Sequence, residues 1–357
     1  MTTRQFSRRT FLRGVGATMA LPLAGTGLAV TGCHTTITNS ASDETGQSRL
    51  LSKSRNPGHA INLPPGAIID THIHVVHGNP DLKPIPEEME RLTASPPEVK
   101  ARRLRTDMEQ ANVAVAFAMG HREGQGDDPL GIKTSLEVAA FVPGVKVIGI
   151  ADPRRVTRDH FLAVERQVDL ERDKVVAFKA YLGYVHFGPE DPRYVPYFKL
   201  AAKYSLPVIF HTGDTWSFKA KQTFALPLRV DEAATAHPEV QFVIAHLGKP
   251  WFIDAAQVVW KNQNVWADLS GLYVGDEKSI DGLLKQERLP EVMPGLVISD
   301  LRNALGYADK YDRIVYGSDW PLAPMSVYRR FCEAIIPKQH HEAVFRTNAA
   351  RLFGLRT

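Results

Sequence analysis

The chain has 357 residues, 44% hydrophobic and 23% charged, which is typical of a soluble globular protein. Its formal charge of +4 comes from the first 32 residues, which hold four arginines and no acidic side chain. Without those four, the 43 Lys and Arg residues fall to 39, equal to the 39 acidic residues, so nothing in the composition indicates a nucleic-acid partner. Cys33 and Cys332 are the only cysteines, and no disulfide can form within the chain if Cys33 carries lipid, so a large core has to stabilise the fold.

Residues 1–32 are predicted to be a twin-arginine signal peptide. The segment SRRTFLR (7–13) is similar to the bacterial twin-arginine motif, and a Gly- and Ala-rich apolar run follows it. The run ends in VTGC (30–33), which resembles a lipobox, so Cys33 is expected to be lipidated. This predicts a membrane-anchored lipoprotein, exported to the periplasm or the cell surface. A short uncleaved membrane anchor and a chance cysteine are the alternatives.

Residues 33–66 are expected to form a flexible tether between the lipid on Cys33 and the folded domain. The segment is rich in Ser, Thr, Asn, Gly and Pro and has no sustained apolar period. The folded domain is then expected to span residues 67–357.

Eight short apolar runs, rich in β-branched residues, follow in that domain, and amphipathic helical stretches separate most of them. The runs are AIIDTHIHV (67–75), VAVAFAMGH (113–121), VKVIGIADP (145–153), VVAFKAYLG (175–183), LPVIFHTGD (206–214), VQFVIAHLG (240–248), NVWADLSG (264–271) and RIVYGSDWP (313–321). Strands that alternate with helices indicate parallel pairing, so the pattern predicts an α/β fold, a (β/α)₈ TIM barrel. An open doubly wound sheet is the alternative, but no glycine-rich phosphate loop follows the first strand.

Three further segments are predicted from composition. The proline-rich stretch 76–97 is expected to be a long loop after the first strand, where it either covers the mouth of the barrel or is a surface excursion. Residues 279–312 are expected to hold extra helices, and residues 337–355 a closing helix. Cys332 lies in an apolar helical stretch and is expected to be a core residue.

Polar residues stand at equivalent points of several predicted strands. In the first strand, alternation places Asp70, His72 and His74 on one face, and two neighbouring imidazoles can chelate a divalent ion. The same position of later strands holds Lys179, His211, His246 and Asp319. Any one of these residues is more often a hydrogen-bonded strand end than a ligand. Because a barrel gathers its strand ends at one mouth, the set indicates an active site there.

This ordered set resembles the amidohydrolase superfamily, and more narrowly its amidohydrolase-related branch, which also contains non-oxidative decarboxylases. The matching motifs are DTHIH (70–74), FKA (178–180), VIFHTG (208–213), VIAHLG (243–248), YGSDWP (316–321) and NAARLFG (348–354).

The resemblance implies a metal-dependent enzyme. It implies that His72, His74, His211 and Asp319 hold one divalent metal, zinc first, with Mn or Fe as alternatives. Asp70 is expected to be a hydrogen-bond partner and not a ligand.

Lys179 and His246 are the positions at which the family divides. In binuclear members the lysine is carboxylated and bridges two ions, and the histidine binds the second. In the branch that is most similar to this chain one ion is usual, and the histidine acts on substrate or water. One ion is therefore expected, and two if Lys179 is carboxylated. Otherwise Lys179 either pairs with an anionic substrate or remains a buried ammonium near Asp319.

The first functional hypothesis is hydrolysis of a carboxylic ester, lactone or amide-type bond in a small-molecule substrate by a metal-activated water. Asp319 would act as the base, and His246 would orient the reactants or stabilise the oxyanion. The alternative is non-oxidative decarboxylation of an aromatic or unsaturated acid, with Arg122, Arg154, Arg193 and Lys219 as candidates to bind it. A non-catalytic binding lipoprotein is the third hypothesis. Six aromatic residues either line the pocket or pack its rim: Tyr181, Tyr184, Trp216, Trp251, Tyr273 and Trp320.

Overall fold

A computed structural model describes residues 59–60, 63–75, 87–122, 126–288 and 297–356. The predicted signal peptide, Cys33 and most of the tether lie outside these ranges, as do residues 76–86 of the predicted loop. Within the described ranges, no helix combines the length and the apolar character needed to cross a membrane.

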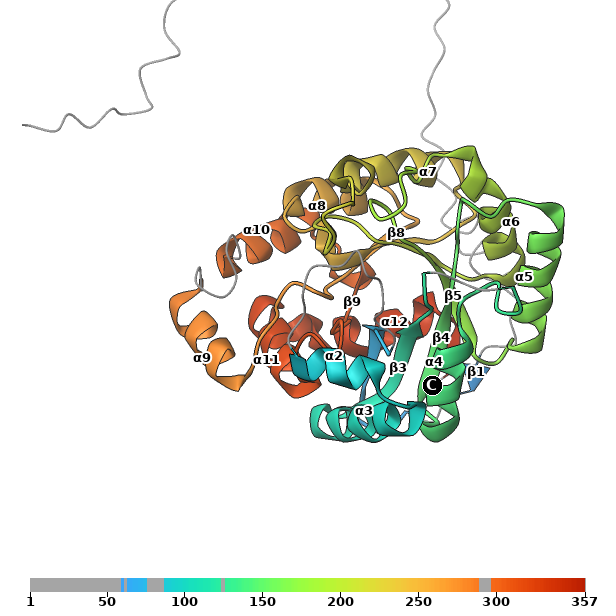
Figure 1. The fold of residues 1–357 in the computed structure, drawn as a ribbon. Coiled ribbons are helices and arrows are strands. Elements are labelled where there is room, and N and C mark those ends of the chain that lie inside the picture. The colour runs from blue at the N-terminus through green and yellow to red at the C-terminus, as the bar shows by residue number, and fades with distance from the viewer. Residues whose placement is uncertain (1–58, 61–62, 76–86, 123–125, 289–296, 357) are drawn as a thin grey trace, which may run out of the picture. The chain divides into compact units, whose positions relative to one another are not determined.

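Eight parallel strands form one sheet in chain order, and helices surround it (Figure 1). The strands are β2 Ile68–Ile73, β3 Val113–Met119, β4 Val145–Ile150, β5 Val175–Ala180, β6 Val208–Phe210, β7 Phe242–Ile244, β8 Val265–Asp268 and β9 Ile314–Val315. Each lies inside one of the eight predicted runs. The fold is an α/β TIM barrel, as predicted.

The segment after β9 closes the barrel against β2. The backbone N–H of Thr71 donates to the carbonyl of Tyr316 over 3.0 Å, and that of Asp319 donates to the carbonyl of His72 over 2.8 Å. Trp320 adds a parallel bridge to Ile73. The first and last strands of the eight-stranded sheet therefore become neighbours, although 245 residues of sequence separate Thr71 from Tyr316.

Helices separate most of the strands, as predicted. They are α2 Glu87–Ala94, α3 Pro97–Ala111, α4 Lys133–Phe141, α5 Arg158–Leu170, α6 Val195–Tyr204, α7 Val230–Ala236, α8 Phe252–Lys261, α9 Glu277–Gln286, α10 Ile298–Ala308, α11 Met325–Ile335 and α12 Asn348–Leu352. Helix α3 begins with Pro97, whose missing N–H costs nothing in a first turn, and ends at Asn112 in a left-handed conformation. Helices α9 and α10 are the extra helices expected in 279–312, and Cys332 is buried in α11.

Short helical turns complete the connections. They are the 3₁₀ turns η1 Pro192–Tyr194, η2 Gln222–Phe224, η3 Pro227–Arg229, η4 Ala245–Gly248, η5 Tyr311–Arg313 and η6 Lys338–His340, and the π-helical turn η7 Ala343–Thr347.

Three predicted segments are corrected. The predicted 76–97 loop contains helix α2, which begins with several acidic residues that favour a helix N-terminus. The predicted closing helix at 337–355 is broken into η6, η7 and α12. Part of the predicted tether takes part in the fold, because β1 (His59–Ala60) pairs with β10 (Leu355–Arg356) and Leu63 is buried.

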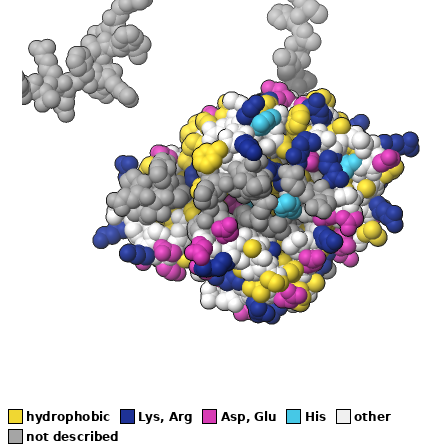
Figure 2. Space-filling model, viewed as in Figure 1, with side chains coloured by type: hydrophobic (Ala, Val, Ile, Leu, Met, Phe, Trp, Pro, Cys, Tyr) yellow, Lys and Arg dark blue, Asp and Glu magenta, His cyan; other side chains and the backbone are white. Residues whose placement is uncertain are grey.

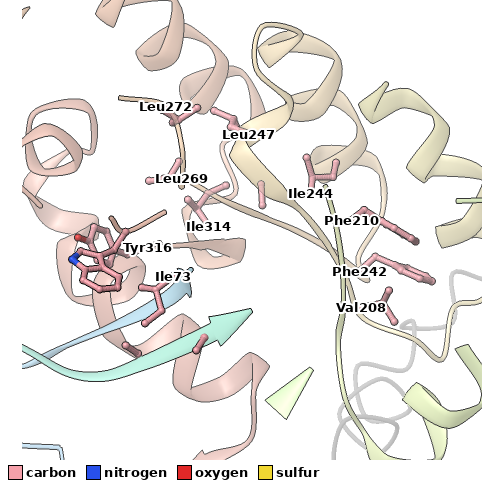
Figure 3. Close-up of a cluster of buried hydrophobic side chains, with 14 of the residues drawn as sticks. Ile73, Val208, Phe210, Phe242, Ile244, Leu247, Leu269, Leu272, Ile314 and Tyr316 are labelled. Carbon is pink, nitrogen blue, oxygen red and sulfur yellow. The ribbon is translucent and has the colours of Figure 1, made fainter. Parts of the chain in front are cut away.

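The core has two layers. Between the strands and the helices, Phe210 and Phe242 stack with ring centroids 5.4 Å apart (Figure 3). Inside the barrel, a second cluster collects inward-facing residues such as Phe117 on β3. Phe353, just after α12, meets Phe117 edge-on with a centroid distance of 4.7 Å. The C-terminal segment therefore fills the end of the barrel at which the strands begin.

Charged side chains of both signs are interspersed over the described part of the face in Figure 2. This distribution matches the balanced charge of the chain after residue 32.

Candidate metal centre

Three potential ligands converge at the end of the barrel where the strands finish. Nε2 of His74 lies 3.2 Å from Oδ1 of Asp319, and Nε2 of His72 lies 3.6 Å from the same oxygen. These three residues form a group whose ligand atoms are close enough to hold one ion. Two imidazole nitrogens with one carboxylate oxygen are a donor set suited to a divalent transition metal, so the residues fit the metal that the sequence predicts.

A register shift in β2 aims the two histidines. Ile68 and Ile73 both pack in the outer core layer, although they lie five residues apart, which strict alternation forbids. Between Asp70 and Ile73 the pairing of β2 with β3 slips by one residue. Such an irregularity turns the following side chains. The prediction that Asp70, His72 and His74 share one face is therefore wrong.

Asp70 contacts the backbone of two segments that carry potential ligands. Its Oδ1 accepts the backbone N–H groups of His72 and Ser318 over 3.1 and 3.0 Å, and its Oδ2 has no hydrogen-bond partner among the described residues. Burial raises the pKa of Asp70 to about 7. Asp70 thus ties the part of β2 that carries His72 to the segment that carries Asp319, which is consistent with its predicted role as a hydrogen-bond partner.

Asp319 lies in a left-handed backbone conformation, with φ of 59°. Burial by itself would raise the pKa of this carboxyl, but a hydrogen bond from His74 and the nearby His72 and His246 hold the pKa well below its usual value. Asp319 is therefore an ionised acceptor inside the barrel mouth.

Lys179 lies beside the potential ligands, on β5. It is fully buried, and its Nζ is 3.5 Å from Nε2 of His72. Burial lowers the pKa of Lys179 to about 8, while Asp268 and Asp319 act in the opposite direction. Burial and Lys179 together lower the pKa of His72 to about 3, so its ring is neutral, as a metal ligand must be.

His211 and His246 form a pair next to this group. Nε2 of His246 is 3.1 Å from Nδ1 of His211, and Nε2 of His211 donates to the carbonyl of Asp214 over 3.0 Å. Nδ1 of His246 lies 4.0 Å from Oδ2 of Asp319. His211 is thus at the mouth, as predicted, but it lies outside the group of three, and its role as a ligand stays a prediction.

Asp268 and Ser270, at the end of β8, are absent from the residues predicted from the sequence. Oδ2 of Asp268 accepts from Nδ1 of His72 over 2.8 Å, and Oγ of Ser270 lies 2.9 Å from Nδ1 of both His72 and His246. Burial would raise the pKa of Asp268, but His72 lowers it well below its usual value. Asp268 follows three apolar residues, the same signal that identifies His211 and His246.

The structure sorts the basic residues that were candidates for binding an acid. The Arg122 guanidinium lies 5.4 Å from the ring centroid of Tyr184, and the Tyr184 ring lies 4.8 Å from that of His211. Arg154 is instead paired with Asp152, and Arg193 with Asp191. Arg122 is thus linked to His211 through the Tyr184 ring.

The aromatic residues are divided in the same way. Tyr181 and Tyr184 meet edge-on beside the site, with ring centroids 6.1 Å apart. The backbone N–H of Trp216 donates to the hydroxyl of Tyr184 over 2.8 Å, and burial raises the pKa of Tyr184 to about 12. Tyr273 and Trp320 are almost completely buried and pack in the outer core layer.

Solved structures share this architecture at low sequence identity. The chain is similar to an uncharacterized TIM-barrel protein from Bordetella bronchiseptica (17% identity, 81% of this chain and 98% of that one, TM-score 0.58). It is also similar to 5-carboxyvanillate decarboxylase LigW from Sphingomonas paucimobilis (14% identity, 81% and 99% covered, TM-score 0.54). A third structure is 5-carboxyvanillate decarboxylase LigW2 from Novosphingobium aromaticivorans, with bound manganese and a nitrobenzoic acid (12% identity, 83% and 99% covered, TM-score 0.53).

A comparison with curated protein sequences gave no match. A family model described as Amidohydrolase matches residues 69–355, from the first strand of the barrel to the segment after α12. This span holds every potential ligand described above. The chain belongs to the amidohydrolase family.

Proposed function

We propose that this chain is a metal-dependent non-oxidative decarboxylase of an aromatic or unsaturated acid. The observation that carries the proposal is the contact chain from Arg122 through the Tyr184 ring to His211. It places a cation for a carboxylate and a surface for a planar ring beside the potential metal ligands. Two of the similar structures are decarboxylases of an aromatic acid, which supports this choice over hydrolysis.

The metal is proposed to be one divalent ion per chain, zinc or manganese, with iron as a further candidate. His72, His74 and Asp319 would hold it, with His211 as a proposed fourth ligand. When bound, the ion would supply Lewis-acid polarisation of a substrate oxygen. Metal analysis of the purified protein tests the stoichiometry: two equivalents per chain would contradict the single-ion proposal and point to a carboxylated Lys179.

The chain's own residues would then bind the acid and move a proton. Arg122 would pair with a substrate carboxylate, while Tyr181 and Tyr184 flank the ring. In the reaction the bond to the carboxyl carbon breaks, carbon dioxide leaves, and the electron pair stays on the ring carbon, which must take up one proton. Asp319 would take up a proton from solvent water on a carboxylate oxygen and deliver it to that carbon. His246, 4.0 Å from Asp319, would orient the reacting groups.

Hydrolysis of an ester, lactone or amide-type bond is the second candidate function. The observation in its favour is the ionised Asp319, because attack by water requires a proton acceptor at this place. Aromatic acids, esters and lactones should therefore be tested side by side.

Isotopes separate the two reactions. In D₂O, decarboxylation gives a product with one deuterium on the carbon that lost the carboxylate, together with carbon dioxide. In H₂¹⁸O, hydrolysis gives an acid with one ¹⁸O. Deuterium incorporation without ¹⁸O supports the decarboxylase. The opposite result contradicts it, and metal-loaded protein without turnover of any substrate would favour a binding lipoprotein.

We also propose that the protein is exported by the twin-arginine route and anchored by lipid on Cys33. The support is the segment SRRTFLR (7–13) followed by VTGC (30–33). The intact mass of the mature protein tests it: a mature chain that begins at Cys33 and carries the mass of lipid is expected. A mature protein without lipid on Cys33 would contradict the proposal.

A further inference from the structure

We propose that Asp268 and Ser270 are positioning residues of the metal centre, which fix the ring nitrogen that His72 offers to a metal and the turn that carries His246. The inference rests on the proposed metal site, and it assigns a role to the end of β8, which supplies none of the proposed ligands. Both residues are buried, with 1% of Asp268 and none of Ser270 exposed.

The first contact sets the tautomer of His72. Its Nδ1 lies 2.8 Å from Oδ2 of Asp268, and the Asp268 carboxylate accepts the backbone N–H groups of His246 and Ser270 as well, so Nδ1 carries the proton. Nε2 then keeps its lone pair, and it faces Oδ1 of Asp319 at 3.6 Å and Nζ of Lys179 at 3.5 Å. The carboxylate thus makes His72 a ready ligand and increases its basicity.

The second oxygen of Asp268 supports the turn after β7. Oδ1 accepts the backbone N–H of His246 over 2.9 Å. His246 and Leu247 have φ values of 60° and 44°, a left-handed conformation that is costly for residues other than glycine. The hydrogen bond that His246 donates to Asp268 helps to hold this turn, and with it the imidazole that faces His211 and Asp319.

Ser270 joins the two histidines to the same carboxylate. Its hydroxyl donates to Oδ1 of Asp268 over 2.6 Å, and its oxygen lies 2.9 Å from Nδ1 of both His72 and His246. The next residue, Gly271, has φ of 64°, and a Cβ there would lie 2.7 Å from Oδ2 of Asp319. The end of β8 is therefore fitted closely to the centre.

All described hydrogen bonds of the Asp268 carboxylate come from donors. They are His72 Nδ1–H, the backbone N–H groups of His246 and Ser270, and the Ser270 hydroxyl. In Asp268→Asn one oxygen becomes an NH₂ group, which has to face a donor on either side. The arrangement is relieved if His72 moves its proton to Nε2, and that change removes the lone pair intended for the metal.

The experiment measures the tautomer and the metal affinity separately. In metal-free protein with ¹⁵N-labelled histidine, NMR should show the His72 proton on Nδ1 in the wild type and on Nε2 in Asp268→Asn. The His72 signals are identified by their loss in His72→Gln. Competition with a chelator should show zinc or manganese binding 10- to 100-fold weaker in Asp268→Asn. Asp300→Asn, at an exposed position of α10, makes the same charge change and should leave both values unchanged.

An unchanged tautomer together with unchanged metal affinity in Asp268→Asn would overturn the inference. If the wild type binds no divalent ion, the metal site proposed above fails, and the tautomer of the metal-free protein still decides the role of Asp268. If Asp268→Asn does not fold, Ser270→Ala decides. It keeps the carboxylate, and we expect 3- to 10-fold weaker metal binding, whereas wild-type affinity would overturn the inference.

Discussion

At the end of the barrel where the strands begin, the interior is filled by apolar side chains such as Phe117, Phe353 and Leu63. At the end where the strands finish, it is filled by histidines, a lysine and carboxylates, most of them almost completely buried. The first end is stabilised by burial of apolar area and is tolerant of how its groups are oriented. The second needs a partner for every charge, because an unpaired buried charge is costly.

The backbone shows the same difference. Among the described residues, seven other than glycine have positive φ. Four of them are ordinary helix ends, at the C-caps of α3, α6, α9 and α10. The other three are His246, Leu247 and Asp319, all at the mouth. Strained backbone outside helix ends is thus confined to the end that carries the proposed chemistry, where the surrounding hydrogen bonds hold it in place.

The largest effect is expected from Asp319→Asn at the mouth. The amide cannot take up a proton, so kcat should fall by about 10³-fold, in the range typical of a lost general acid or base. Much of the metal should remain bound through the two histidines, and the melting temperature should change little. Steady-state kinetics and metal analysis check this, with Asp300→Asn as the matched control. A fully active variant would show that Asp319 does not move the proton.

The next largest effect is expected from Phe117→Ala, at the end of the barrel where the strands begin. Removing this fully buried ring leaves a cavity against Phe353, so the free energy of unfolding should fall by about 3–5 kcal/mol. Metal affinity per folded molecule should be unchanged. Denaturant titration measures the stability, and Phe141→Ala, at a position that is 43% exposed, is the control. Equal losses of stability in both variants would contradict a stabilising role for the apolar cluster around Phe117 and Phe353.

Arg122→Met tests whether the mouth of the barrel binds the carboxylate of the substrate. If Arg122 pairs with the substrate carboxylate, KM for an acid substrate should rise about 10- to 100-fold, the equivalent of a lost charged hydrogen bond. The values for the metal affinity and the melting temperature should stay close to wild type. Arg193→Met removes an ion pair with Asp191 and should leave KM unchanged. A similar KM for both variants would remove Arg122 from substrate binding.

The smallest effect is expected from Leu63→Ala. This variant tests whether Leu63, in the predicted tether, belongs to the apolar cluster inside the barrel. Leu63 is 8% exposed in the inner cluster, so its truncation should cost about 2 kcal/mol of stability, the low end for a buried leucine. Leu170→Ala, at a position that is 72% exposed, should have no measurable cost. Denaturant titration compares the two. Identical unfolding midpoints for the two variants would show that Leu63 does not contribute to the core and belongs to the tether.

Local pattern in the sequence was enough to predict the eight strands, because continuous apolar runs are required by burial on both faces of a parallel sheet. Helix α3 is one of the amphipathic helices expected between the strands, and Pro97 and Asn112 mark its ends. His72, His74, His246 and Asp319 were found in the same way, as polar residues that end apolar strands. These features depend on residues that are close in sequence, so local sequence patterns are sufficient to predict them.

Tertiary structure decided the rest. A slip in pairing with β3 turns His72 to the mouth and leaves Asp70 behind it, and alternation along β2 cannot predict a slip that arises between two strands. Arg122 is beside the site because only the fold places Tyr184 and His211 next to it. Asp268 supports His72 across 196 residues of sequence. The sequence by itself determined which groups the barrel brings to its mouth, and only the packing of distant strands determined how those groups pair.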